Sequence, residues 1–411
     1  MRKLSLSFLS DPVWSKVMGL TTVLFFALLA DAILSDWVPV YLQNVLGGSF
    51  LMGVVMSFSS MIGFGADLIF PQLLKGTSVR KLMVMAVLSG GLFSVALLTT
   101  TWWPILIIIL VAMAIWGIYY EFLGFANQQF VVETAPAHQR SQVWAVMGVF
   151  KNLAYFLGPI LGSILIKGGD RGVVIVAGVI SLVAYFLVLL MRIKSRPVVV
   201  EAEEINLVKE ASHWKVLIKH VWPMLLVTFM LGLIDATFWT TGTVFTELLS
   251  LKSWWGGLFL PMYTLPSLFV GFFVFKWGIY KGKKRWAEIF LLFGGIVLSL
   301  LYFRDSIFYE LGIVFLSSIM LSVSYPLVDA VYSDIVARMG RERKHLVGLG
   351  SSMASLSYIL GPILAGFISS RVGERMTFVS MGLATVVVAI VLLITTPRKL
   401  LLPQVEIKNW N

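Results

Sequence analysis

Long apolar stretches alternate with short polar connections along almost the whole sequence. Each stretch holds about 20 residues, which as an α-helix rising ~1.5 Å per residue would cross the ~30 Å hydrocarbon core of a bilayer. The predicted helices lie near residues 17–41, 49–74, 80–101, 103–131, 141–166, 172–191, 220–246, 254–278, 286–303, 309–335, 345–369 and 375–396. The pattern therefore predicts an all-α membrane protein with twelve transmembrane helices.

A repeated stretch divides this pattern into two halves. Residues 153–161 read LAYFLGPIL and residues 356–364 read LSYILGPIL, with seven of nine positions identical at an offset of 203. Asp31 and Asp235 also fall within one residue of that offset. The one sizeable polar segment lies between the halves. We therefore predict an N-terminal six-helix bundle (1–191), a linker (192–219) and a C-terminal six-helix bundle (220–411).

Composition agrees with a membrane protein and excludes several kinds of site. Hydrophobic residues make up 58% of the chain and charged residues 13%, well below the usual quarter of a soluble domain. The absence of cysteine rules out disulfides, thiolate metal sites and cysteine nucleophiles. The first apolar run is too long for a signal peptide and lacks a small-residue cleavage site. The four histidines show no spacing typical of a metal site, and we expect neither a metal nor another cofactor.

The basic residues are distributed unevenly between alternate loops. Of the 32 lysines and arginines, 25 fall in loops on the side of the N-terminus, 6 fall in the opposite loops, and Lys151 lies within a helix. Basic loops stay in the cytoplasm, so both termini and the linker are expected there. The net charge of +11 therefore reflects membrane topology and does not indicate nucleic acid binding.

Twelve helices in two halves of the same direction, with cytoplasmic termini and a central cytoplasmic linker, resemble the major facilitator superfamily of transporters. The loop signature after the second helix of each half is partly kept. The second half has Lys276, Gly278 and the basic run 281–285, with Phe275 in place of the family's Asp; the first half has only Arg80 and Lys81. In the fourth helix, Met113 replaces the family's Arg. The segment from Glu133 through Pro136 to Arg140 is similar to the family's loop between helices 4 and 5.

The repeated stretch itself is similar to a Gly-Pro motif of the family's antiporter branch. It contains Gly158 and Pro159 in the first half and Gly361 and Pro362 in the second. Small residues let helices approach closely, and proline bends a membrane helix. Because both halves carry the motif, we favour a role in packing at the hinge between the bundles over a role specific to antiport.

Four acids are predicted deep in the membrane, where an ionisable group costs about 2.5–3.5 kcal/mol and therefore faces a cavity or a partner. They are Asp31, Glu121, Asp235 and Asp329, on predicted helices 1, 4, 7 and 10. The resemblance implies that these four helices line a central cavity. Asp31 and Asp235 occupy equivalent depths, so this pair is predicted to carry protons or bind substrate, the alternative being that each only satisfies polar groups between helices.

Lys151 and several aromatic residues complete the predicted site. Lys151 is the one base at depth, and a Glu121–Lys151 pair would reduce the cost of burying both charges. Trp116 and Tyr120 share a helix face, as do Asp235 and Trp239, and Tyr325 lies on the face of Asp329. Acids with aromatic walls favour an amphipathic cation, although bundle packing explains most membrane aromatics.

These features predict a secondary transporter of a small organic molecule that works by alternating access. We expect coupling to protons, with efflux of amphipathic compounds preferred over import. The alternative is an importer of an organic anion or a sugar that uses Lys151. A more remote alternative is an integral-membrane enzyme or a lipid transporter. The expected partners are the substrate, protons and the lipid bilayer, and the protein is expected to work as a monomer.

Overall fold

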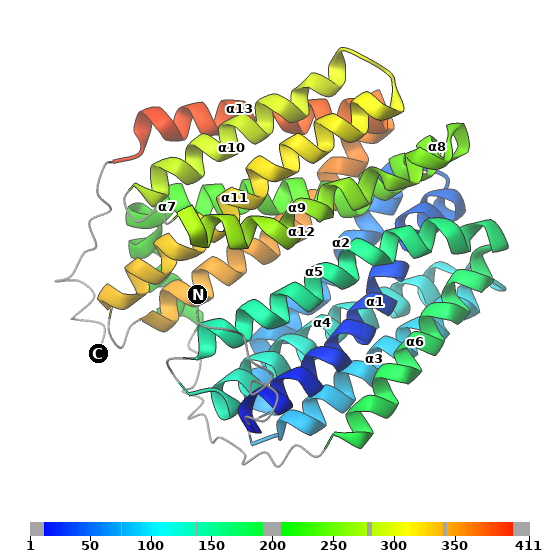
Figure 1. The fold of residues 1–411 in the computed structure, drawn as a ribbon, viewed down its shortest axis with the longest axis horizontal. Helices are drawn as coiled ribbons and strands as arrows, with labels where there is room; N and C mark the ends of the chain where they lie inside the picture. Colours follow the sequence, from blue (N-terminus) through cyan, green and yellow to red (C-terminus); the bar gives the residue numbers. More distant parts are fainter. Residues whose placement is uncertain are drawn as a thin grey trace. The chain divides into compact units, whose positions relative to one another are not determined.

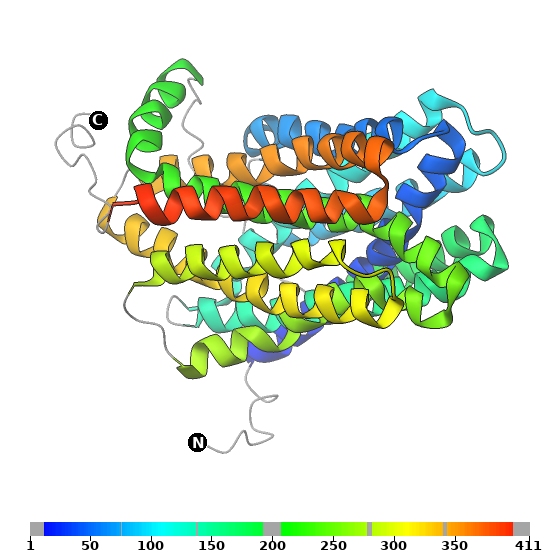
Figure 2. The same cartoon turned by 90° about the horizontal axis from the view of Figure 1, so that it is seen from above.

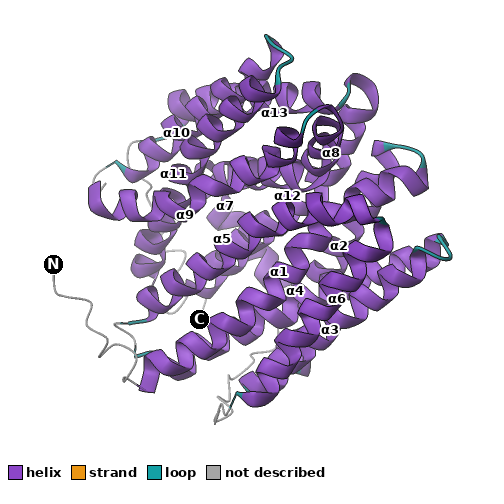
Figure 3. Ribbon diagram, turned by 45° about the vertical axis from the view of Figure 1, so that its right-hand side comes forward, coloured by secondary structure: helices purple, strands orange, loops and turns teal. Residues whose placement is uncertain are grey.

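The computed structural model describes residues 12–74, 76–136, 139–191, 207–277, 282–339 and 343–397. Within these ranges the chain is built from helices and short connections, with no strand (Figure 3). Eleven helical spans among the described residues are long and apolar enough to cross a membrane. A further helix, α9 (Phe259–Trp277), lies where the eighth helix was predicted. The predicted all-α fold of twelve transmembrane helices is confirmed.

The chain forms two compact units. Unit 1 comprises residues 1–45 and 58–202, and unit 2 comprises residues 46–57 and 203–411. The first part of α2 thus belongs to unit 2. The helices in the first half of the chain are α1 (Pro12–Leu46), α2 (Ser49–Leu73), α3 (Val79–Thr100), α4 (Leu106–Thr134), α5 (Arg140–Leu165) and α6 (Asp170–Leu190). The predicted boundaries at 191 and 220 remain a prediction, and residues 192–206 of the predicted linker lie outside the described residues.

The helices in the second half of the chain pack in the same pattern as those in the first. They are α7 (Leu207–Thr237), α8 (Thr243–Lys252), α9, α10 (Lys283–Ser299), α11 (Ile307–Met339), α12 (Arg343–Val372) and α13 (Glu374–Thr395). In unit 1, α3 packs against α4 and α6 (Figure 1). In unit 2, α10 packs in the same way against α11 and α13 (Figure 2). The sequence repeat is therefore also a repeat of structure.

The seventh membrane helix differs from its prediction at its start. Residues 207–219 were predicted as linker, but α7 begins at Leu207 and continues into the membrane span. Leu217 is fully buried in the core of unit 2, whereas Lys215 and Lys219 are exposed. The segment is an amphipathic helix, with Leu217 on its buried side and the two lysines on its exposed side.

The same helix changes geometry near its middle. Between α7 and α8, residues Phe238–Gly242 form a π-helical segment, a feature that is frequent at functional sites. Threonine hydroxyls donate to nearby backbone carbonyls, for example Thr240 to Ala236 over 2.6 Å. These bonds satisfy buried hydroxyl groups where no water is available.

Part of the basic run that resembles the family's loop signature caps neighbouring helices. The Arg80 guanidinium, at the start of α3, donates to the Leu189 carbonyl at the end of α6 over 3.0 Å. Arg285, at the start of α10, donates to the Leu393 carbonyl at the end of α13 over 2.8 Å. Carbonyls in the last turn of a helix lack partners within the helix, and cations there are favourable. Residues 278–281 of this signature lie outside the described residues.

Candidate functional site

Asp31 is the centre of a hydrogen-bond network inside unit 1. It lies on α1 and is only 4% exposed. Trp116 Nε1 donates to its Oδ1 over 2.7 Å, and the hydroxyls of Tyr120 and Tyr155 donate to Oδ2 over 2.8 and 2.7 Å. Bonds to an ionised carboxylate are short and strong. A carboxylate inside the membrane is thus held by three side-chain donors.

Two of these donors come from one face of α4. Trp116 and Tyr120 are four residues apart, so they lie one above the other with ring centroids 5.9 Å apart. The indole ring of Trp116 also stacks on Phe93 of α3, at 5.0 Å and 10° between planes. Packing against Phe93 therefore fixes the orientation in which the indole N–H reaches Asp31.

Asp235 is held similarly inside unit 2. The Tyr263 hydroxyl, from α9, donates to Oδ1 over 2.5 Å, and the Tyr358 hydroxyl, from α12, donates to Oδ2. The ring of Tyr263 stacks on Phe238 of the π-helical segment, with centroids 3.8 Å apart and 11° between planes. The π-helical segment thus orients one of the two donors to this carboxylate.

The repeated stretch supplies one donor in each unit. Tyr155 and Tyr358 occupy the same position in the two copies, 203 residues apart. Three residues later in each copy stands the glycine of the Gly-Pro motif. A Cβ built on Gly158 would lie 2.3 Å from the Cβ of Ala32, and one built on Gly361 would lie 2.5 Å from the Cβ of Ala236.

Ala32 and Ala236 directly follow the two aspartates in the sequence. The glycines therefore permit a close approach of α5 to α1 and of α12 to α7, at distances that any side chain would prevent. This approach brings each tyrosine hydroxyl within reach of its carboxylate. The Gly-Pro stretch thus packs helices, and its packing also positions a hydrogen-bond donor.

Sequence reasoning missed Tyr155, Tyr358 and Tyr263. A signal for the first two was present, because tyrosine is the one polar residue that both copies of the repeat share. Tyr263 has no such signal. The residue 203 positions earlier is Ser60, so the repeat does not identify the tyrosine.

Glu121 contacts a residue other than its predicted partner. Its side chain forms a hydrogen bond with Asp67 of α2 instead of an ion pair with Lys151. Glu121 follows Tyr120 by one residue, a rotation of about 100° around the helix, and so turns away from Asp31 toward α2. A hydrogen bond between two carboxyl groups requires a proton on one of them.

Lys151 lies beside the Asp31 network. Its Nζ atom is 5.9 Å from the centroid of the Tyr155 ring, and its side chain is exposed. Lys151 precedes Tyr155 by four residues on α5, which places the two side chains on one face. Unit 1 therefore carries a cation next to the tyrosine that contacts the carboxylate.

The other predicted site residues of unit 2 lie on α11 and in the π-helical segment. Tyr325 donates to the Leu231 carbonyl over 3.0 Å, one turn before Asp235 on α7. Trp239 belongs to the π-helical segment and packs partly buried against the core. Asp329 is exposed on α11, and its backbone carbonyl accepts a hydrogen bond from the Ser333 hydroxyl over 2.8 Å.

The prolines of the Gly-Pro motif, Pro159 and Pro362, lie inside α5 and α12.

Comparison with known protein families matches the chain almost from end to end. The family model described as Major Facilitator Superfamily matches residues 2–159, 126–287 and 254–409. The chain belongs to the Major Facilitator Superfamily. It is a multi-pass membrane transporter of this family and not an enzyme.

Two quinolone resistance proteins named NorA, both from Staphylococcus aureus, are similar in sequence. The protein of strain MSSA476 is 24% identical over 274 residues, which cover 64% of this chain and 67% of the relative. The protein of strain MRSA252 is 23% identical with the same coverage.

Solved transporter structures show the same fold. The human organic anion transporter MFSD10 (TETRAN) has a TM-score of 0.65 and 17% identity, covering 93% of this chain and all of that one. A structure that shows substrate recognition in proton dependent oligopeptide transporters has a TM-score of 0.72 and 12% identity, covering 96% of this chain and 99% of that one.

Proposed function

We propose that this transporter exports small amphipathic organic compounds in exchange for protons. The observation that carries the proposal is the pair of carboxylates, Asp31 and Asp235, each held by a tyrosine from the repeated stretch. A carboxylate at membrane depth is costly and marks a proton or substrate pathway. Protonation would weaken its acceptor bonds, so proton binding and release can rearrange the surrounding helices within each unit.

The aromatic neighbours support an amphipathic substrate. Trp116, Tyr120 and Tyr155 surround Asp31, and Tyr263 and Tyr358 contact Asp235. Aromatic faces bind organic cations and planar compounds, and a carboxylate adds charge pairing. The similarity to NorA, a quinolone resistance protein, supports efflux, because export of a compound confers resistance to it. Quinolones are also planar aromatic compounds, of the kind that aromatic side chains bind. Alternating access, the mechanism of this fold, would couple proton entry to substrate exit.

Flux into proteoliposomes tests this proposal. The purified chain is reconstituted, a pH gradient is imposed, and movement of two probes, ethidium and a quinolone, is followed by fluorescence. We expect proton-driven flux in the wild type and its loss in Asp31→Asn and in Asp235→Asn. Asp334→Asn is the matched control, because Asp334 forms an ion pair with Lys283 over 2.7 Å and is not one of the two aspartates at the centres of the networks. Full flux in both site variants would overturn the coupling role.

Lys151 supports a second candidate, transport of an organic anion. Its exposed ammonium group lies next to Tyr155, a position where a substrate carboxylate could bind. Binding of a fluorescent organic anion such as fluorescein to Lys151→Ala and to Lys151→Arg tests this candidate. Loss of binding in the first variant and retention in the second would favour the anion; equal binding of fluorescein to wild type and Lys151→Ala would eliminate this candidate.

A further inference from the structure

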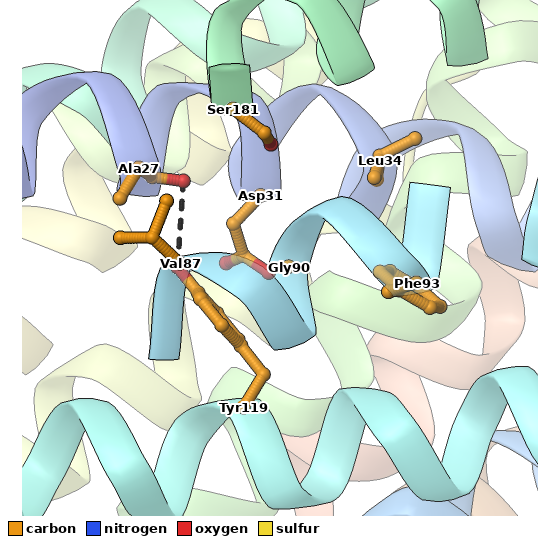
Figure 4. A pocket seen from close by; sticks show the side chains of 8 residues that line it. All are labelled: Ala27, Asp31, Leu34, Val87, Gly90, Phe93, Tyr119 and Ser181. Atoms are coloured by element: carbon orange, nitrogen blue, oxygen red, sulfur yellow. Dashed lines mark hydrogen bonds between the residues drawn. The ribbon is translucent and has the colours of Figure 1, made fainter. Parts of the chain in front are cut away.

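A small cavity lies beside Asp31 within unit 1 (Figure 4). Its lining comes from four helices and includes Ala27 and Asp31 of α1, Gly90 of α3, Tyr119 of α4 and Ser181 of α6. Its interior has room for about one water molecule. The cavity is separate from the three donors already bonded to Asp31, none of which lines it.

Three polar side chains meet at this cavity: Asp31, Ser181 and Tyr119. The Tyr119 hydroxyl donates to the Ala27 carbonyl over 3.4 Å, drawn as the dashed line in Figure 4. That distance is longer than the usual range, so the hydroxyl is able to turn to a nearer acceptor. Ser181 is buried, with 6% of its surface exposed. A buried water needs two to four polar partners, and the lining provides them.

The carboxylate of Asp31 has capacity for one more bond here. A carboxylate offers about four acceptor sites. Two donors occupy Oδ2, and Trp116 alone donates to Oδ1 among the bonds of this network. Oδ1 can therefore accept a further hydrogen bond from a group in the cavity.

We infer that this cavity binds one water molecule, which donates a hydrogen bond to Asp31 and accepts one from the Ser181 hydroxyl. The water links α6 to the carboxylate and leaves Trp116, Tyr120 and Tyr155 in place. Its role in transport rests on the proposed function of Asp31 as a proton carrier. Its existence does not depend on that function.

The lining favours water over a metal cation. Hard divalent cations take six or more oxygen ligands, whereas the cavity presents oxygens from only Asp31, Ser181, Tyr119 and the Ala27 carbonyl. The other lining residues are apolar.

The space for the water depends on Gly90. A Cβ built on Gly90 would lie 3.3 Å from Cε2 of Tyr119, at the edge of the cavity. The adjacent Gly91 has nothing within 4 Å of such a Cβ. Gly90→Ala therefore reduces the cavity, and Gly91→Ala is the matched control on the same helix.

Structures of the full chain in lipid, at a resolution that shows ordered water, test the inference. We expect density about 2.7–3.2 Å from Asp31 Oδ1 and Ser181 Oγ in the wild type and in Gly91→Ala. We expect loss of that density in Ser181→Val and in Gly90→Ala. The two variants act independently, so one of them still tests the inference if the other does not fold. A wild-type cavity without density, or density unchanged in both variants, would overturn the inference.

Two further measurements separate the possible outcomes. The midpoint temperature of thermal unfolding is expected to be the same in sodium chloride and in potassium chloride. A higher midpoint in sodium chloride that disappears in Ser181→Val would show that the cavity binds a cation instead of water. Proton-driven ethidium flux is expected to fall in Ser181→Val and to be unchanged in Gly91→Ala. Water density without any proton-driven flux would refute the proposed function and retain the water site. Flux that depends on Asp31, without water density, would refute the water site and retain the proposed function.

Discussion

A tyrosine hydroxyl bonded to a membrane carboxylate stabilises the charged form of the acid and responds when that charge is lost. Tyr155 does this for Asp31 and Tyr358 does it for Asp235. Interhelical hydrogen bonds inside membranes contribute about 0.6 kcal/mol on average and up to ~1.7 kcal/mol. A single bond of this kind therefore contributes modestly to the stability of the fold, and it does so through the charged form of the acid.

Tyr155→Phe is expected to separate the effect on stability from the effect on flux. The variant keeps the ring beside Lys151 and removes one of three donors to Asp31. We expect the free energy of unfolding to fall by at most ~1.7 kcal/mol. Proton-driven flux should fall roughly tenfold, as a change of about 1.4 kcal/mol in the barrier gives. Tyr185→Phe, on α6 beside Phe186, is the control. An equal flux in both variants would contradict the assigned role of Tyr155.

At this scale the sequence identifies the acids better than their partners. The repeat and the equivalent depths of the two acids located Asp31 and Asp235, and four-residue spacing placed Trp116 and Tyr120 on one face. The Glu121–Lys151 pairing failed because depth does not specify the direction in which a side chain points around the helix. Tyr263 could not be found, since the contact joins α7 to α9 and depends on how these helices pack.

At the scale of the helix, the Gly-Pro stretch determines how closely two neighbours approach. A Cβ on Gly361 would meet the Cβ of Ala236, and its next contacts, with Leu233, lie at an ordinary 3.7 Å. On Gly158, a Cβ would also lie 2.9 Å from the backbone carbonyl carbon of Ala32. The contact in unit 2 therefore depends on one side chain, whereas the contact in unit 1 also involves backbone.

This difference predicts unequal rescue. Gly361→Ala should destabilise the protein by about 1–3 kcal/mol through overpacking and reduce flux by moving Tyr358 away from Asp235. Adding Ala236→Gly should restore both stability and flux. The corresponding pair, Gly158→Ala with Ala32→Gly, should be rescued only in part.

Chemical unfolding and proteoliposome flux measure both quantities, and Gly148→Ala, with open space at its Cβ, is the control on α5. Full rescue in both units, or in neither, would contradict this account. The repeat predicted helix packing at these positions. It could not predict the difference, because backbone distances are set by the folded structure.

At the scale of the whole molecule, the two compact units do not coincide with the two halves of the sequence in one segment. Residues 46–57 belong to unit 2, although they lie in the first half of the sequence. A Cβ on Gly53 would be 2.1 Å from the Pro362 carbonyl oxygen, and one on Gly366 would be 2.3 Å from the Ser49 carbonyl oxygen. Hydropathy located the helix but could not show which unit its first turns join, since that contact is long-range.

A divided chain tests this arrangement. Residues 1–206 and 207–411, produced together as two polypeptides, are expected to associate and to be purified as one complex. Gly53→Leu in the first fragment should reduce recovery of the complex roughly tenfold, equivalent to ~1.4 kcal/mol of association free energy. Gly48→Leu, whose Cβ has open space around it, should have no effect. Equal recovery with both variants would exclude this contact as a determinant of association.

The equivalence of Tyr155 and Tyr358 also bears on how such a chain arises. If the halves descend from one duplicated six-helix segment, a contact at the same position in both was present before the copies were joined. The ancestral segment then already had an acid bound by a tyrosine beside a close glycine contact. Trp116 donates to the acid in one copy and Tyr263 in the other, so the two carboxylates no longer have the same set of donors.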